Sequence, residues 1–297
     1  MPRPPLPLAS RASAALLLLA SLSSAQEPVL NCRPGTVEVN LDYACDGRGL
    51  PANNLGNEGP QTGSHSIRYL NVGQLQGTGS FDLVVTALSS YHSLDAPSQN
   101  GCSRGRFGRI NIWVRRAPAP RSFYSLAHFT LLPVRAQGGN SVDLLFTFMS
   151  GSSPVVLPAT YFSFFAIDTG PSGQNTESLQ FNPAGIADFA ITQQLDGGRE
   201  SDVIRSGTTF TGRVQGAASG DPWLTGPGDP MRLTADEQTR AVTILLEGAS
   251  SFVVTASVTL PGSATSGGGR NLIFAGRSNL IHDQCPPAMP SPPPPLP

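Results

Sequence analysis

Residues 142–181 constrain the fold of this chain more than any other stretch. Residues 142–149 alternate apolar and polar side chains, which is the period of a half-buried β-strand. After a Gly-Ser-Ser-Pro break, residues 161–167 form an almost entirely apolar run, which turn residues end at 168–173. Alternation resumes at residues 177–181. We interpret this stretch as the central strands of an antiparallel β-sandwich.

Many other segments repeat the same period of two. In residues 251–260, apolar side chains occupy every second position from Phe252 to Leu260, and Ser or Thr takes most positions between them. Residues 46–64 are rich in Gly, Asn and Pro, which predicts a long loop. The other expected strands are residues 36–41, 66–72, 81–88, 109–115, 125–132, 187–192, 208–214, 241–246 and 271–276.

Only one helix start stands out. Thr234-Ala-Asp-Glu237 matches a capping box, in which the Thr hydroxyl and the Glu carboxylate each accept a hydrogen bond from a backbone amide of the first turn. The helix must be short, because residues 242–246 already follow the strand pattern. We therefore predict an all-β fold, an antiparallel β-sandwich or jelly roll with at most one or two short helices.

The two ends differ from the middle. Arg3 and Arg11 precede an apolar run at residues 14–20, and small residues follow at 23–25, which is the order of a secretory signal peptide. The run is too short to span a bilayer, and we expect no transmembrane segment elsewhere. These observations predict a secreted, extracellular protein. Its parts are a signal peptide over residues 1–25, a β-sandwich domain over 26–285 and a proline-rich tail over 286–297.

The tail carries Ser291-Pro-Pro-Pro-Pro295. Consecutive prolines fix φ and remove amide donors, so the segment favours an extended polyproline II rod. It resembles the repeat of extensins and of other hydroxyproline-rich glycoproteins of plant and algal cell walls. The resemblance implies a wall or matrix setting, and an inert linker is the alternative interpretation.

Charge excludes several classes of partner and chemistry. The chain has a net charge of −1 and all of its basic residues are Arg. A weakly acidic chain without a basic run argues against nucleic acid as a partner. The absence of Lys excludes Schiff-base catalysis and a phosphate-loop lysine.

The four cysteines are Cys32, Cys45, Cys102 and Cys285. An even number in an exported chain predicts two disulfides. Neighbours in sequence could pair, as Cys32–Cys45 with Cys102–Cys285. We favour Cys32–Cys285 with Cys45–Cys102, because the first and last cysteines bracket a domain whose ends should lie close together.

Asp168-Thr169-Gly170 follows an apolar run, as the catalytic motif of aspartic proteases does. Those enzymes need two carboxylates that share a proton, and the chain has no second such motif. We therefore interpret Asp168 as the start of a turn after a strand.

The region around Asp168 also resembles the "choice-of-anchor" type of bacterial and algal exoprotein β-sandwich. The resemblance rests on Phe146-Thr-Phe148, an apolar strand ending in Ile167-Asp168, a Gly-rich turn and Glu177. It implies an adhesive or structural module outside the cell, sometimes with bound calcium. Thr169 stands where a second acidic residue is expected.

Calcium also has a physical argument. Ca²⁺ takes six to eight oxygen ligands, and loops at strand ends supply them. Asp168, Asn175 and Glu177 flank one such loop, so we predict that they bind Ca²⁺. We assign no other cofactor.

Two tryptophans are candidates for sugar binding. Trp113 is expected on the strand face opposite Ile110 and Ile112, and Trp223 lies in a Gly- and Pro-rich loop. An exposed indole can stack on a sugar ring, although most large aromatic residues fill the core.

Enzyme motifs are largely missing. No Gly-x-Ser-x-Gly occurs and no histidine lies in a motif that orients a base, so we assign no catalytic residue. The sequence predicts a secreted structural or recognition module of the matrix or cell wall, with a polysaccharide or matrix glycoprotein as partner. The alternative is a carbohydrate-active hydrolase or lyase, whose paired carboxylates a sequence pattern does not reveal.

Overall fold

The computed structural model describes residues 35–48, 50, 52–93, 100–114, 138–170, 173, 175–192, 200–215, 228–260 and 268–282. The predicted leader, the proline-rich tail, the expected strand at 125–132, Cys32, Cys285 and Trp223 lie outside these residues.

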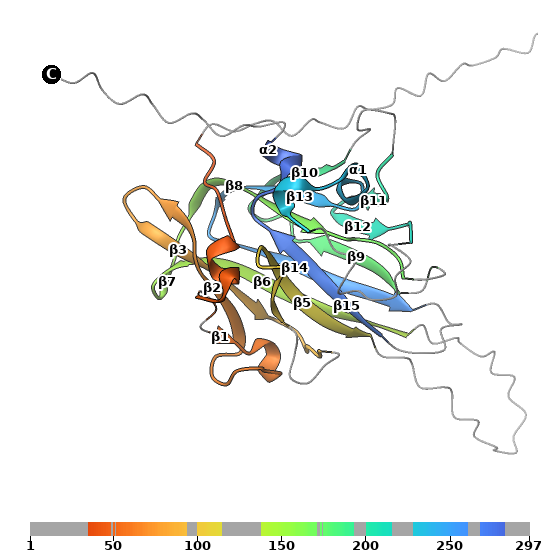
Figure 1. The fold of residues 1–297 in the computed structure, drawn as a ribbon, viewed down its shortest axis with the longest axis horizontal. Helices are drawn as coiled ribbons and strands as arrows, with labels where there is room; N and C mark the ends of the chain where they lie inside the picture. Colours follow the sequence, from red (N-terminus) through yellow and green to blue (C-terminus); the bar gives the residue numbers. More distant parts are fainter. Residues whose placement is uncertain are drawn as a thin grey trace, which may run out of the picture.

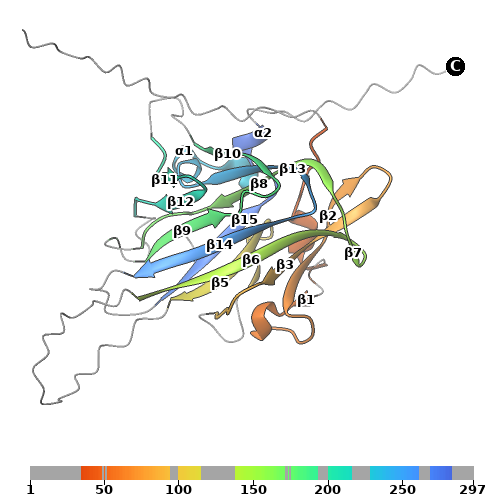
Figure 2. The same ribbon diagram turned by 180° about the vertical axis from the view of Figure 1, so that it is seen from behind.

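Two antiparallel sheets face each other, as Figures 1 and 2 show from opposite sides. Sheet A runs in the order β1 (Ala52–Asn53), β2 (Ser66–Leu75), β3 (Gly79–Ala87), β6 (Gly138–Ser150), β14 (Ser251–Leu260), β9 (Thr176–Phe181), β12 (Thr209–Gly212) and β11 (Val203–Ser206), with β7 (Ser153–Pro154) beside β6. Sheet B runs in the order β10 (Ile186–Ile191), β13 (Val242–Ala249), β8 (Leu157–Phe165), β15 (Gly268–Ala275), β5 (Phe107–Val114) and β4 (Gly101–Ser103). The predicted all-β sandwich is confirmed.

The core lies between the sheets and is rich in phenylalanine. The Phe146 ring on β6 stacks on Phe252 of β14 at 4.8 Å and meets the edge of Phe274 on β15 at 5.2 Å, centroid to centroid. Each of these side chains comes from an apolar position of an alternating strand. The period of two thus brings one face of every central strand into the same core.

The outer side of sheet B is covered by the chain itself. The 3₁₀ turn η4 (Pro230–Arg232) and the helices α1 (Ala235–Gln238) and α2 (Asn279–His282) lie there. Leu233 and Leu280 pack against Phe165 and Ile273, which point outward from β8 and β15. Helix α1 carries the predicted capping box, with both reciprocal hydrogen bonds present. No helix among the described residues is long and apolar enough to cross a membrane.

Residues 36–41 differ from the prediction, because they form no strand. Hydrogen bonds connect the segment to both sheets. Val37 N donates to Ala159 O at 2.8 Å and Val37 O accepts from Thr160 Oγ1 at 2.7 Å, whereas Asn40 N donates to Val72 O at 2.6 Å. Val39 and Leu41 are nevertheless buried. The alternation in this segment reflects burial at one end of the sandwich. The chain crosses there from one sheet to the other and does not pair continuously with any strand.

Short elements also escaped the prediction. The expected loop at 46–64 contains β1, the end of the π-helical turn η1 (Ala44–Arg48) and the 3₁₀ turn η2 (Leu55–Asn57), and β11 pairs with β12. Two to four residues are too few to show a period.

Candidate functional site

Asp168 and Glu177 meet at one end of the sandwich around Arg270. Glu177 points inward from β9 on the same face as Leu179, and Arg270 points inward from β15 on the same face as Leu272. Arg270 Nε donates to Glu177 Oε1 at 2.6 Å, and its Nη2 donates to Asp168 Oδ1. This ion triad therefore joins sheet A to sheet B.

Burial dominates the electrostatics of the ion triad. It raises the pKa of Asp168, although Arg270 opposes the shift, and it raises the pKa of Glu177 to about 7 against the same opposition. Burial also disfavours the charged form of Arg270, but Glu177 and Asp168 outweigh this and raise its pKa. One guanidinium faces two carboxyl groups, so an ionised triad has one negative charge in excess.

The two carboxylates converge as the calcium argument requires, with an arginine between them. Asn175, the third predicted ligand, has a left-handed backbone with φ of 60°, and its Oδ1 is buried without a hydrogen bond. No group of three or more His, Cys, Asp or Glu in the described ranges could hold a metal. Arg270 already supplies the positive charge, and calcium binding stays a prediction.

A small cavity lies beside the ion triad, between the sheets. Ile112, Leu179, Val258 and Leu272 line it together with Glu177 and Arg270. Its volume is about 20 Å³, which is room for one or two water molecules. A carboxylate pair that hydrolyses glycosides or peptides needs space for a water and a substrate between its members. This pair has a guanidinium there instead.

Trp113 lies near the end of β5 and faces the outer side of sheet B. Its backbone N–H donates to His92 O at 2.9 Å, and its carbonyl accepts from Asn140 Nδ2 at 2.7 Å. The indole is half-buried, and the ring of His92 lies edge-on to it at 6.4 Å. Gly269 is its register partner on β15, so no side chain covers the indole from that position.

Polar groups surround this indole. His92 has a side chain that is 61% exposed, and its Nδ1 lies 2.9 Å from Glu58 Oε1. The other carboxylate oxygen of Glu58 accepts from Ser93 N at 2.8 Å. We call Trp113, His92 and Glu58 the indole site. It offers an aromatic surface with a ring nitrogen and a carboxylate at its border.

A buried polar network holds the indole site in place. The Tyr91 hydroxyl shares its one proton between Asn100 Oδ1 at 2.9 Å and Asn111 O at 2.5 Å. Asn111 Nδ2 donates to Asn271 Oδ1 at 3.0 Å, which ties β5 to β15. Burial raises the pKa of Tyr91 well above its ordinary value, so the hydroxyl stays a donor. These hydrogen bonds satisfy groups of β5 beyond the point where its neighbour β4 ends.

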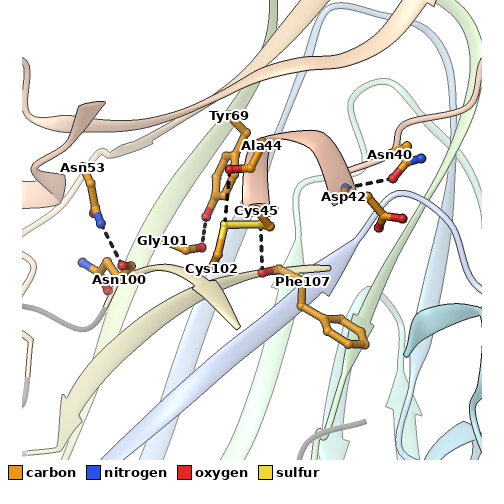
Figure 3. The surroundings of a disulfide bond; sticks show 10 residues. All are labelled: Asn40, Asp42, Ala44, Cys45, Asn53, Tyr69, Asn100, Gly101, Cys102 and Phe107. Atoms are coloured by element: carbon orange, nitrogen blue, oxygen red, sulfur yellow. Dashed lines mark hydrogen bonds between the residues drawn. A yellow bond between two sulfur atoms is a disulfide. The ribbon is translucent and has the colours of Figure 1, made fainter. Parts of the chain in front are cut away.

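The Cys45–Cys102 disulfide attaches β4 to the turn η1 (Figure 3). Its S–S distance is 2.08 Å and its Cα atoms are 5.4 Å apart. Next to it, Tyr69 donates its hydroxyl to Gly101 O at 2.7 Å and Asn53 Nδ2 donates to Asn100 O at 2.8 Å. The bridge agrees with the pairing that we favour from the sequence and excludes Cys32–Cys45.

Arg270, the partner of the predicted Asp168 and Glu177, had no sequence signal, and neither had His92 beside Trp113 or its partner Glu58. Arg270 lies 93 residues from Glu177 in a Gly-rich stretch, and Glu58 lies 34 residues from His92 in an expected loop. Only the pairing of strands brings them together. The predicted opposite faces of β5 do appear in the structure, with Ile110 and Ile112 in the core and Trp113 outside.

No family model and no curated protein matches the chain. Three solved structures are similar to it at low sequence identity. The adhesin domain of PrgB from Enterococcus faecalis has 12% identity and a TM-score of 0.40 over 72% of this chain and 64% of that domain; it is also known bound to DNA. The Glucan Binding Protein C of Streptococcus mutans has 13% identity and a TM-score of 0.35, over 76% of this chain and 62% of that one. The N-terminal domain of the Streptococcus gordonii adhesin Sgo0707 has 9% identity and a TM-score of 0.34, over 71% and 45%. The chain thus spans less than two thirds of each of these three.

Proposed function

We propose that this protein is a secreted recognition module of the cell wall or extracellular matrix that binds carbohydrate at the indole site. The observation that carries the proposal is the position of Trp113. Its indole is half-buried on the outer side of sheet B, and its register partner on β15 is a glycine, which puts no side chain over the ring from that position. Aromatic rings with polar neighbours suit sugars, which have an apolar C–H face and a polar border.

The neighbours of Trp113 support the proposal. The His92 ring lies beside the indole and is held there by Glu58, and hydroxyl groups of a sugar can both donate hydrogen bonds to such polar groups and accept them. The network below Trp113 fixes the strand before any ligand arrives. Preorganisation of this kind reduces the entropy that binding must overcome.

Binding is favoured over catalysis because of where the carboxylates converge. Asp168 and Glu177 meet inside the sandwich around Arg270 and beside a cavity of about 20 Å³. A hydrolase or lyase would need such a pair in a cleft that admits a polysaccharide. Secretion is supported by the leader-like residues 1–25 and by the Cys45–Cys102 disulfide, which suits an oxidising compartment.

Binding to linear neutral glucan oligosaccharides, measured by calorimetry, tests the proposal. Trp113→Ala should weaken binding by about tenfold or more, because stacking on the ring is lost. His92→Ala and Glu58→Gln should weaken it less. Tyr43→Ala is the matched control, since Tyr43 is an exposed aromatic residue away from the indole site. Equal affinities for the native protein and Trp113→Ala would contradict the proposal.

A further inference from the structure

The outer side of sheet A carries a row of hydroxyl groups across four adjacent strands. The strand registers place Thr211 of β12 opposite Ser178 of β9, Ser178 opposite Ser257 of β14, and Ser257 opposite Ser141 of β6. We call these four residues the hydroxyl row. Neighbouring strands lie about 4.8 Å apart, so the row offers one hydroxyl per strand at a nearly constant spacing.

A second polar row runs beside the first. Its members are each two positions away from the hydroxyl row on the same strand. They are, in the same strand order, Thr209, Gln180, Thr255 and Asp143, which lie opposite one another. Asp143 is the one charged residue in the two rows, and Thr255 Oγ1 donates to its Oδ1 at 2.6 Å. The rows are about 6.7 Å apart along the strands. Together they form a track of hydrogen-bonding groups in which Asp143 is the one charged side chain.

The residues of the track are half-buried or exposed. In Figure 2 no described helix or strand crosses β6, β14 or β9. At its edge, Ile204 of β11 is the register partner of Thr211 and is 51% exposed. An aliphatic side chain at the end of a hydroxyl row adds an apolar contact without adding charge.

This surface lies on the opposite side of the sandwich from the indole site. Ser257 alternates with the core residues Ala256 and Val258, so it points outward from sheet A. Trp113 follows Ile112, another core residue, and points outward from sheet B. The two sheets and the core between them separate the two surfaces.

We infer that the hydroxyl row binds a second, neutral polysaccharide chain across the strands, and that the domain thereby cross-links two chains. This inference rests on the proposed function of the indole site. The spacing of the strands is close to the length of one sugar ring, so a chain of sugars can contact each strand in turn. The occupant is uncharged because the track holds no cation for an acidic polymer.

The chemistry of the track favours a sugar over an apolar protein surface. An apolar partner would remove the hydroxyl groups from water without replacing their hydrogen bonds, which disfavours binding. Sugar hydroxyls both donate and accept, so they can replace water at each position of the row. Each bond contributes little by itself, and the surface should therefore need a chain of several sugars.

Calorimetry with a neutral linear glucan hexasaccharide and the matching disaccharide tests the inference on the full-length secreted protein. The native protein should bind two hexasaccharides and one disaccharide. Trp113→Ala should bind one hexasaccharide and no disaccharide. Ser257→Glu, which places a bulky anion in the hydroxyl row, should bind one hexasaccharide and keep the disaccharide. Ser251→Glu is the matched control on the same face of β14, three rows away, and should keep both hexasaccharides.

Ser257→Ala provides a second variant that adds neither bulk nor charge, and it should weaken binding at the hydroxyl row by a few-fold. Circular dichroism spectra and melting temperatures check that each variant folds. One hexasaccharide per native molecule, lost in Trp113→Ala and kept in Ser257→Glu, would overturn the inference and leave the proposed function intact. One hexasaccharide lost in Ser257→Glu and kept in Trp113→Ala would overturn the proposed function and the cross-linking of two chains, and would leave only binding at the hydroxyl row. No binding by the native protein would overturn both.

Discussion

The two sheets of this sandwich have unlike outer sides. Sheet B is covered, so Phe165, Tyr161 and Leu245 are buried although they point away from the central core. On the outer side of sheet A, no described helix or strand crosses β6, β14 or β9, and the outward positions are mostly Ser and Thr that are half-buried or exposed. The sequence carries this difference. Seven consecutive buried residues end β8, whereas buried and half-buried positions alternate along most of β14.

The comparison separates stability from recognition. The outer side of sheet B stabilises the fold through apolar contacts, and Trp113 lies half-buried at one end of it. The outer side of sheet A contributes little apolar burial, so its side chains are available to a ligand. Substitutions on the two sides should therefore differ sharply in how much they lower the free energy of unfolding.

The largest difference is expected for Phe165→Ala against Val253→Ala. Phe165 is 1% exposed on the outer side of sheet B and meets the edge of Phe107 at 5.5 Å, so its truncation should lower the free energy of unfolding by about 3–5 kcal/mol. Val253 is half-buried on the outer side of sheet A, so Val253→Ala should lower the free energy of unfolding by only about 0.5–1 kcal/mol. Urea unfolding measures both. Similar losses would mean that the two outer sides are equally covered.

Removing Arg270 tests the connection between the two sheets. Arg270→Gln leaves Asp168 and Glu177 buried without their cation, and we expect a loss of about 3 kcal/mol. A guanidinium and a calcium ion would occupy the same place, so calcium should raise the melting temperature of Arg270→Gln more than that of the native protein. A native shift equal to or larger than that of the variant would place any calcium site away from the triad.

Much of this architecture could be predicted, for a physical reason. A strand that buries one face must alternate, and residues 251–260 do so without interruption. Contacts between distant strands leave no such pattern. The meeting of Asp168 and Glu177 followed from one loop, but Arg270 arrives through the pairing of β15 with β5 and β8. The prediction of a strand at residues 36–41 was wrong. The alternation there reflects burial, and the segment has no ladder of backbone hydrogen bonds to a neighbouring strand.

The ion triad should also make stability depend on pH. The pKa of Glu177 is about 7 in the folded protein, above its ordinary value of 4.5, so the folded state binds this proton more tightly than the unfolded state. The contribution is complete below pH 4.5 and is lost as the pH rises through 7, by roughly 3 kcal/mol.

Chemical unfolding at a series of pH values from 4.5 to 8.5 measures this dependence. Glu177→Gln removes the titrating group and should flatten the curve in that interval. The nearby Arg240 pairs with Asp236 at 2.7 Å and lies 3.6 Å from Asp202. Asp202→Asn therefore serves as a control for a carboxylate close to the triad but outside it. Native stability that rises between pH 5 and pH 8 would contradict the expected sign.

The smallest effect compares one substitution on the two outer sides. Thr243 of β13 points outward from sheet B, is 2% exposed and shares a hydrogen bond of 2.7 Å with Ser163. Thr243→Val should cost about 1 kcal/mol or somewhat more, because a buried hydroxyl loses its partner where water cannot replace it. Thr255 of β14 points outward from sheet A and donates to Asp143 at 2.6 Å. Thr255→Val should cost about 0.5 kcal/mol or less, because water can reach the freed carboxylate and valine favours strands. Urea unfolding of the two variants measures the difference, which should vanish only if the hydroxyl groups of sheet A are as shielded from water as those of sheet B.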